Sequence, residues 1–375
     1  MSRVHGKRPD GASASVGLKR RPGLLEAERS RVLICRLGRW PSYMSKKIRE
    51  TYQKTFNPNT MPNPSNTYAT KDIPSALDPS AFLLFTNGGK QARAALEAVL
   101  ALNEASRPRI RVTVHSDSSA ASLRAAFPAL NPASILVGDT RELSFQRTAL
   151  TGGVTHVYHV GREFTPSEAV HAIDWIDNAK ATGTVRFFVY VGALHPFRRK
   201  MINHRIKLDV EEYLAEARLP YCVLQPADHM QNHDVKKAVE TGELIQYYSV
   251  DELEAFFDIK DLGEVSVKVL MNPGEHNLAR YELFGYAHTY REAAEILSKV
   301  AGKPVKARKI EREEALVMCT ERAKSRGENE YYANGFAMMI AYNDRFGLLG
   351  NSNVLKWLLG REPTTWEEFC KRVLA

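Results

Sequence analysis

The fold is decided by the stretch Ala81-Phe-Leu-Leu-Phe-Thr-Asn-Gly-Gly-Lys-Gln-Ala-Arg-Ala-Ala-Leu96. Its first part, residues 82–85, is a continuous apolar run, as in buried parallel strands. A glycine pair follows, and from Gln91 apolar residues recur at helical spacing. The first N–H groups of such a helix point back at the end of the strand, where a pyrophosphate can bind. The order of strand, glycine turn and helix therefore predicts a phosphate cradle over Thr86, Asn87, Gly88, Gly89, Lys90 and Gln91.

The glycine pattern of this turn is incomplete. In the dinucleotide-binding pattern G-x-x-G-x-x-G, this chain has Thr86, Gly89 and Ala92, so only the central glycine is in place. A threonine would be strained there if the turn requires a positive φ. If Thr86 only weakens the site, Thr86→Gly should tighten dinucleotide binding, and no gain would indicate another use of the cradle. A strand-to-helix turn that binds nothing explains this stretch equally well.

The positive charge of the chain is confined to its first residues. The net charge is +9, and residues 1–50 alone hold 13 Lys/Arg against 4 Asp/Glu, so the remainder is balanced. This distribution does not predict a nucleic-acid groove. Four separated cysteines lack the spacing of a disulfide framework or zinc site, so we expect reduced thiols, no metal and a cytoplasmic protein. No apolar run approaches the ~20 residues of a membrane span.

Strand-like and helical segments alternate six times between residues 80 and 226. Continuous apolar strands joined by short helices predict an α/β fold with a doubly wound parallel sheet. Before them, we expect residues 1–79 to form a basic, disordered leader followed by a Pro/Asn-rich arm. After them, short elements without regular alternation predict a smaller, mostly helical lobe. We expect a nucleotide-binding core over residues 80–232 and a substrate lobe, interleaved with it, over 233–375.

Ligands of such sheets bind beyond the carboxyl ends of the strands. After the second strand stand His115, Ser116 and Asp117. An acidic residue there favours NAD through the ribose hydroxyls, whereas Lys90 and a protonated His115 favour NADP. Asp139, after the third strand, is a further candidate, although a turn or helix cap explains it as well.

The predicted helix over residues 201–218 carries the candidate catalytic groups. Asn203, His204, Lys207 and Glu211 lie three or four residues apart, on one edge of the helix beside its apolar face. An ammonium at a cleft edge can bind ribose hydroxyls, and His204 is the nearby side chain that titrates near neutral pH. A solvated Lys207–Glu211 pair is the competing interpretation.

Several segments together resemble the NmrA-like family of atypical short-chain dehydrogenases/reductases, especially its fungal members. They are residues 86–91, 188–196, 200–214, 219–232, 257–264 and 349–368. The resemblance covers about residues 80–375 and implies a Rossmann-type domain that binds NADP or NAD, with a small C-terminal substrate lobe. It also implies that Lys207 matches the active-site lysine of short-chain dehydrogenases.

The chain also departs from that family's pattern. Asn203 stands four residues before Lys207, where a tyrosine acts as proton donor, and Gly192 stands where a serine often follows the fifth strand. The Ser–Tyr–Lys relay is therefore absent. The arginine frequent after the second strand is replaced by His115 or Ser116.

Two functions remain open at this point. One is an NAD(P)H-dependent oxidoreductase of a small carbonyl, enone or imine, in fungal secondary metabolism by analogy, with Lys207 orienting the cofactor and His204, or else Tyr190 or His195, giving the proton. The other is a non-catalytic dinucleotide-sensing co-regulator, cytoplasmic or nuclear, that binds a protein partner. A sheet whose cofactor site has decayed is a third interpretation.

Overall fold

The structure is a computed structural model that describes residues 73, 76, 77, 80–161, 165, 167–325 and 330–375. The chain divides into two compact units, residues 1–65 and 66–375, and all described residues belong to the second. The predicted leader and arm, residues 1–79, lie outside the described residues except for positions 73, 76 and 77.

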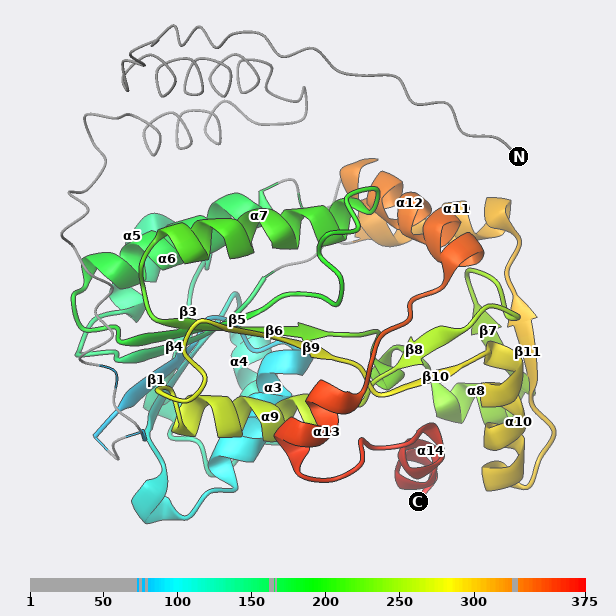
Figure 1. Cartoon of the computed structure of the whole chain (residues 1–375), viewed down its shortest axis with the longest axis horizontal. Helices are drawn as coiled ribbons and strands as arrows, with labels where there is room; N and C mark the ends of the chain where they lie inside the picture. The colour runs from blue at the N-terminus through cyan, green and yellow to red at the C-terminus, as the bar shows by residue number, and fades with distance from the viewer. Residues whose placement is uncertain (1–72, 74–75, 78–79, 162–164, 166, 326–329) are drawn as a thin grey trace, which may run out of the picture. The chain divides into compact units, whose positions relative to one another are not determined.

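A seven-stranded parallel sheet forms the centre of the second unit, with strand order β3-β2-β1-β4-β5-β6-β9 (Figure 1). Its strands are β1 (Phe82–Phe85), β2 (Arg109–Val114), β3 (Ile135–Val137), β4 (His156–Val160), β5 (Phe187–Val191), β6 (Tyr221–Pro226) and β9 (Ala279–Leu283). The order reverses between β1 and β4, which is where ligands bind in doubly wound sheets. The predicted Rossmann-type fold is confirmed.

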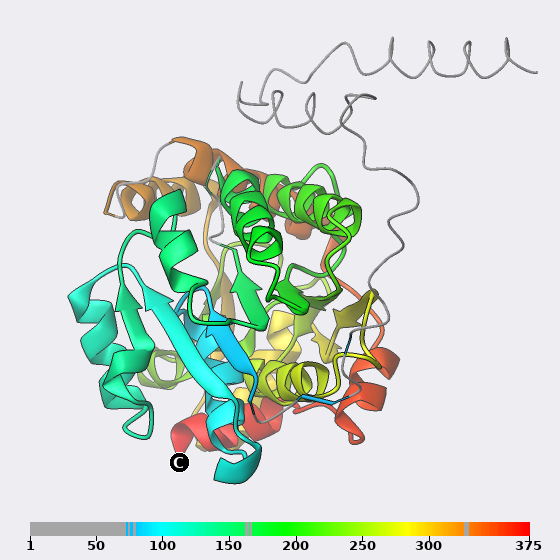
Figure 2. The same ribbon diagram turned by 90° about the vertical axis from the view of Figure 1, so that its left-hand side faces the viewer.

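Helices cover both faces of the sheet, as Figures 1 and 2 show. They are α3 (Lys90–Leu100), α4 (Asp117–Ala126) and α9 (Ile259–Met271) on one face, and α5 (Leu143–Ala149), α6 (Glu168–Ala181) and α7 (Ile202–Glu216) on the other. Successive residues of a strand point to opposite faces. Leu83 and Phe85 accordingly pack in one apolar core, and Phe82 and Leu84 pack in the other.

The last third of the chain builds a smaller lobe with a third apolar core. Its strands are β7 (Glu243–Gln246), β8 (Glu254–Phe256), β10 (Tyr286–His288) and β11 (Lys306–Lys309), and its helices are α8 (Val235–Thr241), α10 (Tyr290–Ala301), α11 (Arg312–Ser325), α12 (Glu330–Phe346) and α14 (Trp366–Leu374). Helix α13 (Asn353–Leu359) packs instead against α9 and β9, in the core of the sheet. The sequence did not predict α8, β7, β10 or α13. It also placed β9 outside the core sheet, because a short, half-exposed edge strand has no continuous apolar run.

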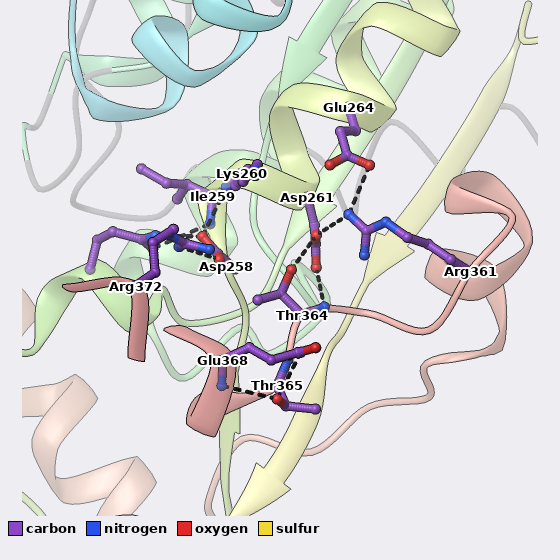
Figure 3. Close-up of polar contacts among 11 residues, drawn as sticks. Asp258, Ile259, Lys260, Asp261, Glu264, Arg361, Thr364, Thr365, Glu368 and Arg372 are labelled. Atoms are coloured by element: carbon purple, nitrogen blue, oxygen red, sulfur yellow. Dashed lines mark hydrogen bonds and ion pairs between the residues drawn. The ribbon is translucent and has the colours of Figure 1, made fainter. Parts of the chain in front are cut away.

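The C-terminal segment is fixed to the start of α9 by two arginine–aspartate pairs (Figure 3). Arg361 binds the buried Asp261 at 2.8 Å, and Thr364 donates to the same carboxylate through its N–H and its hydroxyl. Arg372 of α14 binds the buried Asp258, the N-cap of α9, at 2.5 Å. The charge of each buried aspartate is thus compensated by an arginine. These pairs hold the C-terminal segment and α14 against α9, the helix that packs on α3.

Candidate functional site

The turn between β1 and α3 presents an open helix N-terminus. Helix α3 begins at Lys90, its N-cap Gly89 offers no side-chain acceptor, and its first turn holds no acidic residue. Both Gly89 and Lys90 are exposed. The Gly89 N–H donates to Oδ1 of Asn87 at 2.9 Å, whereas the first turn of α3 has no side-chain cap, so its N–H groups are left for an external acceptor, with the positive end of the helix dipole behind them. Such an arrangement suits an anionic group, and a pyrophosphate above all.

The two glycines of the turn leave little room for side chains. A Cβ at position 88 would lie 3.0 Å from Cγ1 of Val114, and a Cβ at position 89 would lie 3.2 Å from Oδ1 of Asn87. The turn thus comes close to β2, and its glycines permit the approach of another backbone or of a ligand. These residues fit the pyrophosphate of a dinucleotide.

Thr86, which replaces the first glycine, is not strained. Among the described residues, those other than glycine with a positive φ are His195, Arg218 and Leu278, and Thr86 is not one of them. Its hydroxyl lies 2.8 Å from Nδ1 of His159, a buried residue of β4. Burial, with Lys207 and His171 nearby, lowers the pKa of His159 to about 3, so this imidazole is neutral. The threonine therefore links the turn to β4.

The end of β4 joins the cradle to the candidate catalytic lysine. Asn87 donates through Nδ2 to the Val160 carbonyl at 2.6 Å, beside the Thr86–His159 hydrogen bond. One residue further, a Cβ at Gly161 would lie 3.5 Å from Nζ of Lys207. Three consecutive residues of β4 and its loop thus contact the turn and α7. The turn and Lys207 therefore both lie beside the end of β4, at the switch point of the sheet.

Lys207 is buried and forms an ion pair with Glu168, the first residue of α6. The side chains of both residues are almost fully excluded from solvent. The interpretation of Lys207 and Glu211 as a solvated pair is therefore wrong. Hydropathy spacing along one helix could not reveal it, because the partner of Lys207 comes from a different helix.

Glu211, one turn after Lys207 on α7, has its own partners. It accepts from Nε2 of Gln225 at 2.8 Å and pairs with Arg280 at 2.5 Å. Burial raises the pKa of Glu211 despite these partners. A Cβ at Gly192 would lie 3.1 Å from Oε1 of Glu211, so this carboxylate crowds the position where the resemblance to short-chain dehydrogenases implied a serine. A side chain at position 192 would therefore have little room beside the Glu211 carboxylate.

The candidate proton donors differ in their surroundings. His204 is buried, and its Nδ1–H donates to the His195 carbonyl at 3.2 Å. Asn203 precedes it on α7, and its Oδ1 is buried without a partner among the described residues. His195 donates through Nε2 to the Leu349 carbonyl at 2.5 Å and faces Glu282 with Nδ1. Tyr190 is fully buried and stacks on His159.

The outer side of the cradle contacts the loop after β6. Lys90 donates to the Gln231 carbonyl at 3.2 Å, and Gln91 lies 3.1 Å from Nε2 of His229. Arg93 donates through Nε to the Gly88 carbonyl at 2.9 Å and reaches Ser122 of α4. These contacts hold the turn between α4 and the start of the second lobe.

The candidates after β2 and β3 differ in exposure and in hydrogen bonding. His115 and Asp117 are exposed, whereas the Ser116 hydroxyl caps α4 by accepting from the Ser119 N–H at 3.2 Å. Asp139 accepts from Arg141, both from its backbone N–H and from its guanidinium, and that side-chain bond lowers the pKa of Asp139 to about 2. Of these, His115 and Asp117 are left facing solvent.

The structure adds residues that the sequence did not single out as site residues. Thr86 finds its partner in His159, Lys207 finds its partner in Glu168, and Arg93 supports the turn. Sequence spacing could not indicate the Thr86–His159 and Lys207–Glu168 pairs, since they join residues 73 and 39 positions apart, whereas Arg93 lies only five residues after its acceptor Gly88. Within the described residues, no group of His, Cys, Asp and Glu side chains could hold a metal ion. The cysteines of this part of the chain, Cys222, Cys319 and Cys370, are free and buried. No described helix is both long and apolar enough to cross a membrane.

Comparisons with known proteins agree with this architecture. The chain is 27% identical over 238 residues to an NAD(P)H azoreductase of Xenophilus azovorans, which covers 62% of this chain and 80% of the relative. An NADPH-dependent quinone oxidoreductase of Escherichia coli, solved with NADPH, has a similar fold, with a TM-score of 0.63, 22% identity, and 78% of this chain and 100% of that one covered.

Two further solved structures share the fold. A triphenylmethane reductase of Citrobacter sp., solved with NADP(H), has a TM-score of 0.62 and 18% identity, with 78% of this chain and 99% of that one covered. NmrA, a negative transcriptional regulator solved with NAD, has a TM-score of 0.61 and 15% identity, with 79% and 96% covered. The model of the NmrA-like family matches residues 80–370, and the chain belongs to this family.

Proposed function

We propose that this protein is an NAD(P)H-dependent oxidoreductase that reduces a small organic acceptor. The observation that carries the proposal is the single site in which an uncapped helix N-terminus and a buried lysine meet at the end of β4. When bound there, the dinucleotide supplies hydride chemistry. The turn over residues 86–91 would hold its pyrophosphate, and Lys207 would hold its ribose hydroxyls.

The preferred cofactor in this proposal is NADP, with NAD as the alternative. The exposed groups beside the cradle are Lys90, His115 and Asp117, of both charge signs. Among the relatives, the quinone oxidoreductase is NADPH-dependent, and the azoreductase is named for NAD(P)H. For the acceptor we propose a conjugated carbonyl, enone or imine, a class chemically close to the quinones and azo dyes of the relatives. A role in secondary metabolism, and residence in the cytoplasm, are parts of the same proposal.

A non-catalytic regulator that senses the dinucleotide is the second candidate. The absence of the Ser–Tyr–Lys relay favours it, because Gly192 and Asn203 carry no acidic hydroxyl. NmrA itself is a transcriptional regulator solved with NAD. In this alternative a protein partner, in the cytoplasm or nucleus, would replace the small-molecule substrate.

The test combines binding with turnover. NADPH and NADH are titrated into the full chain and followed by fluorescence, and NADPH oxidation is then measured with 1,4-naphthoquinone, an azo dye and an enone. If the protein is an oxidoreductase, it binds the nucleotide and oxidises NADPH with at least one acceptor, and Lys207→Ala abolishes this oxidation. A regulator binds without turnover with every acceptor. No saturable binding of either nucleotide would refute both candidates, and unchanged oxidation by Lys207→Ala would remove Lys207 from the mechanism.

A further inference from the structure

A buried ion pair lies against the backbone at the end of β4. It joins Nζ of Lys207 on α7 to Oε1 of Glu168 on α6, and the two side chains are 3% and 0% exposed. A Cβ at Gly161, the residue after β4, would lie 3.0 Å from the same Oε1 and 3.5 Å from Nζ of Lys207. Both charged atoms therefore lie beside Gly161, where any side chain would crowd them.

The same end of β4 contacts the cofactor cradle. The carbonyl of Val160, the residue before Gly161, accepts from Nδ2 of Asn87 at 2.6 Å. One residue earlier, His159 bonds the Thr86 hydroxyl, and burial together with the nearby charge of Lys207 lowers the pKa of His159 to about 3. The ion pair thus lies next to the residues through which the strand holds the cradle.

Helix α6 supplies the charge that a buried lysine requires. Glu168 is the first residue of α6, and a carboxylate in the first turn of a helix is stabilised by the positive end of the helix dipole. An ammonium that is buried without a counter-ion is strongly destabilised. The dipole of α6 therefore favours the Glu168 carboxylate, and this carboxylate allows Lys207 to remain charged inside the protein.

Contact between α6 and α7 does not by itself require this pair. The two helices pack side by side on one face of the sheet (Figure 1). Further along both helices, the Tyr213 hydroxyl donates to the exposed Asp177 at 2.6 Å. A buried ion pair can often be replaced by apolar residues without loss of stability. Stability alone therefore does not explain why the Lys207–Glu168 pair lies at the ligand edge of the sheet.

We infer that Glu168 is a positioning residue of the cofactor site, which holds the Lys207 ammonium beside Gly161 so that it donates to the ribose hydroxyls of the dinucleotide. The inference rests on the binding step of the proposed function, which the oxidoreductase and the regulator share. Glu168 acts through Lys207, and no bond to the substrate and no proton transfer are assigned to it.

The test is a double-variant cycle on NADPH affinity, measured by fluorescence titration of the full chain. Glu168→Met and Lys207→Met each remove one charge, and the double variant removes both. Each single variant should raise the Kd of NADPH roughly 10–100-fold, the loss expected with a hydrogen bond to a charged group. Because Glu168 acts through Lys207, the Kd of the double variant should equal that of Lys207→Met within about twofold. A purely structural role would leave the Kd of the folded variants unchanged, or would multiply the two losses.

Two further variants keep the test decisive. Asp177→Asn removes the exposed carboxylate that bonds Tyr213 between the same two helices, and it should leave the Kd of NADPH unchanged. Glu168→Asp keeps the carboxylate, so it should bind NADPH more tightly than Glu168→Met, and it replaces that variant in the cycle if Glu168→Met does not fold.

The possible outcomes separate this inference from the proposed function. An unchanged or lower Kd in Glu168→Met, or losses that multiply in the double variant, overturns the inference and leaves the proposed function standing. A wild type with no saturable binding of NADPH or NADH overturns both.

Discussion

Removal of the Thr86 hydroxyl tests whether the altered glycine turn is a structural link or a damaged cofactor site. Thr86 is 2% exposed, and its hydroxyl bonds Nδ1 of His159 at 2.8 Å, while Nε2 of His159 has no partner among the described residues. Thr86→Val keeps the shape and leaves this imidazole without its bond. The expected loss of unfolding free energy is about 1–3 kcal/mol, the cost of an unsatisfied buried polar group.

Thr86→Gly should destabilise the folded state further, because it also removes a buried methyl group and gives the unfolded chain the backbone freedom of glycine. The expected total is roughly 2–5 kcal/mol. Thr86→Ser is the matched control, since it keeps the hydroxyl and should lose only about 1 kcal/mol. Because Thr86 has no positive φ and its hydroxyl is directed at His159, we expect no tighter NADPH binding by Thr86→Gly.

Urea unfolding measures the loss of stability, as a lower midpoint at unchanged slope. Fluorescence titration with NADPH measures the affinity for the cofactor. The reasoning is refuted if Thr86→Val is as stable as Thr86→Ser. A tighter complex of Thr86→Gly would show instead that the threonine obstructs the cradle.

Two further predictions concern buried ionisable groups. Glu168→Met leaves the Lys207 ammonium without its carboxylate and should lower the unfolding free energy by about 3–5 kcal/mol. The double variant Glu168→Met/Lys207→Met should recover most of that loss. Urea unfolding of Glu168→Met, Lys207→Met and the double variant measures this coupling, and additive losses would contradict it. His156 of β4 is buried, and burial, with Arg186 nearby, lowers its pKa from 6.5 to about 4. Its contribution to stability is therefore complete above pH 6.5 and is lost as pH falls toward 4, by about 3 kcal/mol. His156→Gln should flatten the dependence of unfolding free energy on pH over that window, and an unchanged slope would contradict the assignment.

The sequence by itself determined the architecture of the nucleotide-binding core. Continuous apolar strands such as residues 82–85 and 187–191 can be buried on both faces only within a parallel sheet covered by helices. The position of the cradle could be predicted from the succession of strand, glycine turn and helix along the sequence, because such a turn places the first N–H groups of the helix at the end of the strand. Both features depend on residues adjacent in the chain.

The tertiary structure alone decided the partners of the polar groups. Lys207 could be placed on an edge of α7, but its carboxylate partner comes from α6, 39 residues earlier. Thr86 looked like a defect of the pattern until β4 brought His159, 73 residues later, within hydrogen-bond distance. Local pattern fixes which face a side chain occupies, whereas long-range packing determines what it meets there and therefore its charge.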